Sequence, residues 1–152
     1  MSTRLRYAKA APGVSRAMLG LEDYANSTGL EPDLLDLVRM RASQLNGCAF
    51  CLDMHAKDAR ARGESEQRLY LLDAWREAPF YSERERAALA WTEAVTLLPG
   101  HEVADAVYER ALGQFSEAEL ANLTLAIVAI NGWNRLNIAF QTPAGNYQPR
   151  GR

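Results

Sequence analysis

Apolar residues recur at three- or four-residue spacing in each segment between the prolines and glycines of this 152-residue chain. That spacing is the period of an α-helix with one buried face, and no segment alternates apolar and polar residues as a half-buried strand does. The pattern therefore predicts an all-α fold of six or seven helices. The expected helical segments are residues 12–29, 31–47, 48–63, 65–77, 82–98, 102–112 and a last segment that opens at residue 116.

Capping motifs mark the start of two of these helices. Ser82 is followed three residues later by Glu85, and Ser116 is followed by Glu119 in the same way. In this arrangement each side chain accepts a hydrogen bond from a backbone N–H that the first helical turn leaves unpaired. The last segment is apolar on most faces from residue 120 to 130, which predicts a helix in the centre of the fold.

Two features of the second half of the chain allow further expectations. The residues at 45–48, Leu-Asn-Gly-Cys, are echoed by Ile-Asn-Gly-Trp at 130–133. The echo is either chance or a duplicated helix–break–helix unit, and a duplication would interrupt the last helix near Gly132. Residues 142–152 are proline, glycine and polar side chains for the most part, so we expect a loose tail unless a partner subunit orders it.

Length and charge restrict the class of protein. A chain of this length predicts one domain spanning residues 1–152, with its core at about 12–145. With 17 basic and 19 acidic side chains the net charge is −2, which argues against a nucleic-acid partner. No run of about 18 apolar residues is present, so no membrane span is expected. The start of the chain lacks the apolar region of a secretory signal, and we expect a cytoplasmic protein.

The only two cysteines, Cys48 and Cys51, lie three residues apart. A disulfide between them closes too small a loop to staple a fold, so the pair indicates redox chemistry or half of a metal site. Gly47 is suited to end the preceding helix, and the next helix is therefore expected to begin at or near Cys48. The unpaired amides and the dipole of a first turn favour an anion, which lowers the pKa of a thiol placed there.

His55 shares a helical stripe with the two cysteines, because positions 48, 51 and 55 are i, i+3 and i+7. One turn after Cys51, its imidazole is placed to accept the thiol proton directly or through a water. Asp36 lies in the preceding helix. If the two helices fold back as a hairpin, its carboxylate approaches His55 and fixes the tautomer. Asp36 is otherwise a surface acid near a helix N-terminus, where the dipole favours it.

Two less reactive roles stay open for the same side chains. Buried cysteines are commonly inert. A structural zinc site needs four ligands, and the chain offers Cys48, Cys51, His55 and the distant His101, with a carboxylate as a substitute. We expect neither a metal nor a cofactor.

The segment from Arg41 to His55, Arg-Ala-Ser-Gln-Leu-Asn-Gly-Cys-Ala-Phe-Cys-Leu-Asp-Met-His, resembles the AhpD-like alkylhydroperoxidase core of the carboxymuconolactone decarboxylase superfamily. Shorter matches lie at 58–60, 89–91 and 131–137, and the resemblance covers about residues 12–145. It implies an all-α AhpD-like helical bundle with the CxxC pair at the N-terminus of a central helix. It also implies a homo-oligomer built on trimers, either a trimer or a hexamer.

The resemblance further implies thiol peroxidase activity on a hydroperoxide substrate. Cys51 would be the peroxidatic cysteine, Cys48 its disulfide partner and His55 part of the proton relay, with an external dithiol or protein reductant restoring the pair. Two positions depart from the family pattern: Asp36 stands where the family usually has Glu, and Phe50 where AhpD has a second histidine. Decarboxylase members lack the CxxC pair, which argues against decarboxylation here.

Two other functions fit the same residues. In the first, the cysteines exchange with a protein or lipoyl disulfide, as in a dithiol–disulfide carrier or a redox-sensing oligomer, and peroxide reduction is incidental. In the second, the protein is a structural oligomer whose CxxC pair is vestigial.

Overall fold

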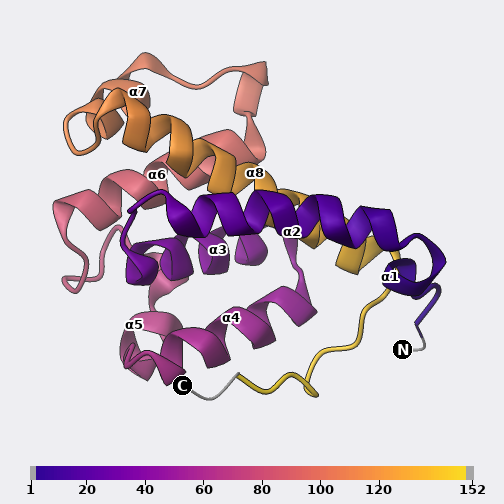
Figure 1. The fold of residues 1–152 in the computed structure, drawn as a ribbon. Coiled ribbons are helices and arrows are strands. Elements are labelled where there is room, and N and C mark those ends of the chain that lie inside the picture. Colours follow the sequence, from indigo (N-terminus) through magenta and orange to yellow (C-terminus); the bar gives the residue numbers. More distant parts are fainter. Residues whose placement is uncertain (1–2, 150–152) are drawn as a thin grey trace.

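The computed structural model describes residues 3–149, and over that range the chain is all-helical, as predicted (Figure 1). Eight α-helices and two short 3₁₀ turns make up the described fold, and no strand occurs in it. Their bounds are α1 Tyr7–Ala10, α2 Pro12–Ser27, α3 Pro32–Asn46, α4 Ala49–Ala61, α5 Glu66–Tyr70, η1 Leu72–Ala74, α6 Glu83–Leu97, η2 Pro99–His101, α7 Asp105–Leu112 and α8 Glu117–Ala139.

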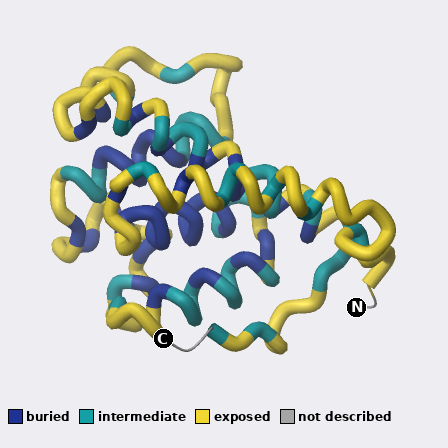
Figure 2. The backbone as a smooth tube through the Cα atoms, in the orientation of Figure 1, coloured by how far each residue is buried: buried dark blue, intermediate teal, exposed yellow. Residues whose placement is uncertain are grey.

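The centre of the fold is α3, which packs against α4, α6 and α8. Every residue from 34 to 43 is buried, and in Figure 2 this helix forms a dark stretch beneath α2. Leu34, Leu35 and Val38 belong to one apolar cluster, shared with α6, α7 and α8. Leu37 and Met40 belong to a second cluster, shared with α4, η1 and α6. Because α3 joins both clusters, it fixes the position of the helix that carries the cysteines.

The last helix is central, since α8 packs against α2, α3, α4, α6 and α7, but it is not buried on every face. In α8, the side chain of Val128 is 50% exposed and that of Ile138 is exposed as well, so this helix keeps one face outside the fold. The buried stretch of α3 includes Asp36, Arg39 and Arg41. Judged by hydropathy alone, these charged residues would place this part of α3 at the surface. Each of these charges has an opposite partner in the folded chain, which permits its burial.

The last helix also continues without a break through residue 132, so the predicted interruption does not occur. A Cβ atom built at Gly132 would lie 2.8 Å from Cε of Met18 on α2. The glycine therefore serves the close approach of two helices, and the echo of residues 45–48 does not mark a duplicated break. Both predicted capping boxes are present, at Ser82 and at Ser116.

Two short elements depart from the expected helices. The pattern contains no signal for α1, because four residues are too few to display a period. The expected helix over 65–77 ends early, at Tyr70, and a 3₁₀ turn follows. That turn brings the indole of Trp75 to α6, where its Nε1 donates a hydrogen bond of 2.8 Å to Glu93.

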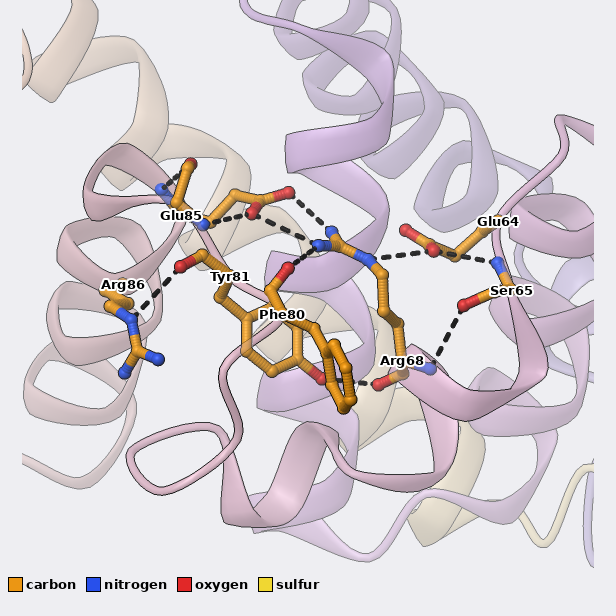
Figure 3. A network of polar contacts seen from close by, with 8 residues as sticks. Glu64, Ser65, Arg68, Phe80, Tyr81, Glu85 and Arg86 are labelled. Atoms are coloured by element: carbon orange, nitrogen blue, oxygen red, sulfur yellow. Dashed lines mark hydrogen bonds and ion pairs between the residues drawn. The ribbon is translucent and has the colours of Figure 1, made fainter.

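A polar network around Arg68 ties α5 to the start of α6 (Figure 3). The Nε of Arg68 donates to Glu64 at 2.9 Å, and its terminal nitrogens donate to Glu85 and to the carbonyl of Phe80. The hydroxyl of Tyr81 donates in turn to the carbonyl of Arg68, and the guanidinium lies over the Tyr81 ring. We call these residues the Arg68 network.

The C-terminal tail lies along α4 rather than loose in solution (Figure 1). Lys57 donates to the carbonyl oxygens of Gly145 at 3.2 Å and Tyr147 at 3.0 Å. The backbone N–H of Gly145 donates to Asp53, and the Tyr147 hydroxyl donates to Asp58 at 2.8 Å. The expectation of a loose tail is therefore wrong for residues 145–147, while residues 150–152 lie outside the described part. The composition of the tail cannot predict these contacts, because the residues that bind the tail are charged side chains of α4.

No helix among residues 3–149 is long and apolar enough to cross a bilayer. The homo-oligomer and the cytoplasmic location stay predictions.

Candidate functional site

Cys48 caps the N-terminus of α4, as the sequence predicts. Gly47 takes a left-handed conformation with φ of 70° and ends α3, and the N–H of Cys48 returns to the carbonyl of Ser43. The sulfur of Cys48 then accepts a hydrogen bond of 3.4 Å from the N–H of Cys51. Both cysteines are free thiols, and each is 1% exposed.

The two thiols differ sharply in acidity. The pKa of Cys48 is lowered to about 7, because its sulfur accepts hydrogen bonds from the Cys51 thiol and from backbone amides of the first turn. The pKa of Cys51 is raised, because its thiol donates to Cys48 and because it is buried. The pair therefore loses its first proton close to neutral pH, and the resulting charge lies on Cys48 while Cys51 keeps its proton. The acidic thiol is the capping one, one turn before the residue that the family resemblance marks as peroxidatic.

Two asparagines of α8 hydrogen-bond to the thiols at the start of α4. The Nδ2 of Asn137 donates to Cys51 Sγ at 3.5 Å, and Asn137 Oδ1 accepts from the hydroxyl of Tyr7 at 3.2 Å. Asn134 is fully buried, lowers the pKa of both thiols by hydrogen bonding, and donates to Ser43 at 3.0 Å. Asn46 of α3 donates to Asn134.

These asparagines were not identified as site residues from the sequence. Their signal is the three-residue spacing of Asn131, Asn134 and Asn137 at the end of an apolar helix, which places polar groups on one side of α8. That spacing cannot say what the amides bind. Only the packing of α8 against α3 and α4 brings them to sulfur.

His55 lies one turn after Cys51, on the buried face of α4. The pKa of its imidazole is lowered to about 3 by burial and by the charges of Arg39 and Arg62. It is therefore neutral at physiological pH. A neutral imidazole has one N–H donor and one acceptor nitrogen, so it can pass a proton on but does not retain one.

Asp36 faces α4, since α3 and α4 fold back on each other as the hairpin expectation requires. Its side chain is buried, which rules out the alternative of a surface acid. The carboxylate binds Arg62, at 2.7 Å from Nε and through a second, shorter contact to a terminal nitrogen. It makes no hydrogen bond to His55, so the expected tautomer-fixing contact is absent here. Burial raises the pKa of Asp36, and Arg62 opposes that rise.

A cavity of about 740 Å³ opens on one side of this cluster, between α2, α3, α4 and the end of α8. Cys51, His55 and Asp36 lie on its wall, together with Arg39 and Arg62. Cys48 is not among the lining residues. The folded chain thus brings three of the four predicted site residues to one cavity and holds the fourth, Cys48, behind Cys51.

The metal alternative has no support in the described chain. No three side chains of His, Cys, Asp or Glu within residues 3–149 are grouped so as to hold an ion. His101, the fourth ligand considered, lies in the exposed turn η2.

Comparison with known proteins places this site in a family. The sequence profile of the carboxymuconolactone decarboxylase family matches residues 12–94, which include α2, α3, α4 and most of α6. The chain belongs to this family. Among its relatives, the uncharacterised protein YdfG of Bacillus subtilis is 42% identical over 96% of this chain and 99% of its own length. The uncharacterised protein YnjA of Escherichia coli is 34% identical over 76% of this chain and 63% of its own length.

Solved structures show which branch of the family the fold follows. A protein of unknown function from Agrobacterium tumefaciens, described as a candidate AhpD antioxidant defence protein, superposes with a TM-score of 0.92. It is 44% identical and covers 96% of this family member and 100% of its own chain. The debrominase Bmp8 superposes with a TM-score of 0.81 at 22% identity, over 91% of this chain and 74% of its own, which shows a shared fold. This carboxymuconolactone decarboxylase family member is therefore AhpD-like.

Proposed function

We propose that this AhpD-like protein is a thiol-dependent peroxidase that reduces organic hydroperoxides through Cys48 and Cys51. The observation that carries the proposal is the placement of a reduced, hydrogen-bonded cysteine pair at the end of a cavity, with only Cys51 on the cavity wall. A substrate that enters the cavity meets Cys51 and not Cys48. This supports Cys51 as the attacking sulfur.

The charge of the pair has to move before the attack. Near neutral pH the proton rests on Cys51, and its transfer along the existing hydrogen bond to Cys48 leaves a thiolate on Cys51. The amide of Asn137, which donates to this sulfur, stabilises that thiolate. The Cys48 thiolate, three residues away on the same turn, is the acceptor for the proton that leaves Cys51.

The reaction proceeds in two steps. The Cys51 thiolate attacks the terminal peroxide oxygen, the O–O bond breaks, and an alkoxide leaves and takes a proton to become an alcohol. That proton comes from solvent, and the neutral imidazole of His55 on the same wall passes it on. Cys48 then attacks the sulfenic acid of Cys51, the S–O bond breaks, and water leaves with the second proton. The resulting disulfide is reduced by an external dithiol, which returns both thiols.

The test is peroxide consumption with an external dithiol by the wild type, Cys51→Ser and Cys48→Ser. We expect Cys51→Ser to fall to the rate without protein. Cys48→Ser retains a hydroxyl that caps α4, so its helix start is preserved. We expect it to consume at most one equivalent of peroxide and to accumulate a sulfenic acid that dimedone traps. A wild-type rate in Cys51→Ser would exclude the proposal.

A dithiol–disulfide carrier uses the same sulfurs, and their burial separates the two functions. A disulfide on the surface of a partner protein does not reach a sulfur that is 1% exposed, whereas a small cyclic disulfide such as lipoamide fits the cavity. The reduced protein should therefore react faster with cumene hydroperoxide than with lipoamide. The opposite order, with negligible peroxide consumption, assigns the carrier function instead.

A further inference from the structure

A tyrosine at the start of the chain is connected to the thiol pair by hydrogen bonds. Tyr7 is the first residue of α1, is half-buried, and lines the cavity together with Cys51. Its hydroxyl donates a hydrogen bond of 3.2 Å to Oδ1 of Asn137 on α8. The Nδ2 of the same amide donates to Cys51 Sγ at 3.5 Å. Two successive hydrogen bonds therefore join the phenol of α1 to the sulfur that is proposed to attack the peroxide.

The segment that carries Tyr7 is held at the C-terminal end of α8 (Figure 1). The backbone N–H of Arg4 donates to the carbonyl of Phe140 at 3.0 Å. The rings of Tyr7 and Phe140 pack against each other, with their centroids 5.7 Å apart. Neither contact uses the phenolic oxygen. The substitution Tyr7→Phe therefore removes the hydroxyl and leaves the segment in place.

The proton of Cys51 decides which end of the Asn137 amide faces the sulfur. The Cys51 thiol donates its proton to Cys48, so its sulfur offers lone pairs to α8. An amide oxygen turned toward this sulfur would meet those lone pairs, whereas Nδ2 donates to them. The oxygen then points away from the sulfur, and Tyr7 supplies its donor. Asn137 is 5% exposed, and a buried amide oxygen without a donor is unfavourable, so the Tyr7 hydroxyl holds the amide in this orientation.

The N–H of Asn137 favours one of the two ways in which the pair can share a single proton. Either Cys48 or Cys51 carries the negative charge, and the acidity of Cys48 makes the charge on Cys51 the minor state. Asn137 donates to Cys51, and a hydrogen bond to a charged sulfur is stronger than one to a neutral sulfur. This bond therefore raises the population of the state in which Cys51 is the thiolate.

We infer that Tyr7 is a positioning residue for the thiol reaction: its hydroxyl holds the Asn137 amide against Cys51 Sγ and so raises the share of pairs that carry the charge on Cys51. The inference rests on the proposed function for the role of Cys51 as the attacking sulfur. Tyr7 and Asn137 both lie outside residues 12–94, which the family profile matches. The two ends of the chain thus complete a site whose thiols lie within the matched segment.

Alkylation of the reduced protein by iodoacetamide tests this role without peroxide or reductant. In the wild type we expect the label on Cys51, which lines the cavity, as mass spectrometry will show. The rate should rise with pH to a plateau, and Tyr7→Phe should lower that plateau about tenfold, as expected for the loss of one hydrogen bond to a charged group. The midpoint should not move, because it follows the first proton lost, which comes from Cys48. An unchanged plateau would overturn the inference.

A general loosening of the site gives a different result. It would expose the Cys48 thiolate, so the label would appear on Cys48 and the midpoint of the profile would shift. Either change in Tyr7→Phe would contradict a positioning role.

The pH profile between about pH 6 and 9 reports the thiols, because the groups around them keep their charge in that range. Burial and the nearby thiol charges raise the pKa of Tyr7, and His55 is neutral because its pKa is lowered to about 3. Burial raises the pKa of Asp36, and its ion pair with Arg62 keeps it ionised. The other charged groups on the cavity wall, which ionise outside this range, are Glu22, Arg39 and Asp58.

Two further variants control for the loss of a tyrosine hydroxyl. Tyr24→Phe removes a matched bond, since Tyr24 donates to Oδ1 of Asn122 at 3.1 Å at an exposed position, and it should leave the plateau unchanged. Asn137→Leu removes the amide, and in this background Tyr7→Phe should have no additional effect. A second loss of about tenfold in the double variant would show that the hydroxyl acts without the amide, and would overturn the inference.

Turnover separates this inference from the proposed function. With cumene hydroperoxide and a dithiol, kcat/KM of Tyr7→Phe should fall by the same factor as the alkylation plateau. Absence of turnover in the wild type, together with a lower plateau in Tyr7→Phe, would refute the peroxidase function and support the positioning role. An active wild type with unchanged kcat/KM in Tyr7→Phe would overturn the positioning role alone.

Discussion

Two arginines of this protein, Arg68 and Arg39, differ in whether all the nitrogens of the side chain have hydrogen-bond acceptors. Around Arg68, the Nε and both terminal nitrogens have acceptors on Glu64, Glu85 and a backbone carbonyl (Figure 3). Around Arg39, a terminal nitrogen is bound to Glu22 and Asn26, but the Nε–H has none. The first set of contacts is completed by folding. The second leaves that one donor without a partner.

The difference teaches how to separate scaffold from site. A saturated polar network such as that of Arg68 positions helices and gains nothing from a ligand. Arg39 lines the same cavity as the neutral imidazole of His55 and as Cys51 of the thiol pair. An unsatisfied buried polar group in a native structure requires an explanation, such as an ordered water, an ion, strain or a catalytic role.

The largest effect on stability is expected for the Arg68 network. Replacing Arg68 with Met leaves Glu64, Glu85 and the Phe80 carbonyl without their donor, and should lower the free energy of unfolding by about 2–3 kcal/mol. For a chain of this size that corresponds to a decrease in Tm of about 4–12 °C. Calorimetry measures it.

The matched control is Arg60→Met, which removes an exposed ion pair with Glu66 and should cost less than about 1 kcal/mol. Neither residue lines the cavity, so both variants should retain peroxide consumption. Loss of peroxide consumption in Arg68→Met at a temperature where it is folded would break the distinction between the two regions.

The second effect concerns His55 on the cavity wall and is seen in the pH dependence of stability. The pKa of His55 is lowered to about 3 in the folded chain from 6.5, so below pH 6.5 the unfolded chain binds a proton that the folded chain does not. Folding is therefore destabilised as the pH falls, by about 1.4 kcal/mol per pH unit and about 2 kcal/mol between pH 7 and pH 5. His55→Gln should lose this part of the slope in urea titrations.

His101→Gln provides the comparison for that experiment, since His101 lies at an exposed position. It should keep the wild-type slope. If the free energy of unfolding of the wild type and of His55→Gln depended on pH in the same way, burial of the imidazole would not disfavour its protonated form.

The smallest effect is expected at the tail, which closes the cavity next to Tyr147. Lys57→Met removes the donor to the carbonyls of Gly145 and Tyr147, and the partly exposed ion pair with Asp53 is lost as well. We expect a cost of about 0.5–1 kcal/mol. Amide hydrogen exchange at Gly145 should accelerate several-fold, because its N–H donates to the Asp53 carboxylate that Lys57 holds.

Lys9→Met, at an exposed position of α1, is the control for Lys57→Met and should leave exchange at Gly145 unchanged. If Lys57→Met also leaves it unchanged, Lys57 does not hold the tail, and other contacts do, among them Gly145 with Asp53 and Tyr147 with Asp58.

Helix starts and stops could be predicted because their causes are local. The capping boxes at Ser82 and Ser116 and the left-handed Gly47 each involve groups within four residues of one another. The place of Cys48 at a helix start follows from the same local rule. The local rules did not predict which helix is most deeply buried. Asp36, Arg39 and Arg41 pair with charges distant in the sequence, and this pairing lets α3 lie at the centre.

The candidate site divides along the same line. Helical spacing brought Cys51 and His55 to one side of α4. The other contacts of the site join residues 26 to 130 positions apart, and no pattern within one segment reports them. They are the contacts of the α8 asparagines, the pairing of Asp36 with Arg62 and the tail contact at Tyr147.

Short-range interactions, acting over a few residues of chain, determined from the sequence alone that the protein is helical and that a thiol begins the fourth helix. Tertiary packing decided which sulfur meets the cavity, which sulfur holds the proton and which arginine keeps an unbound N–H. Those properties depend on burial and on hydrogen bonds between helices. Both arise only when segments far apart in the chain come together and exclude water.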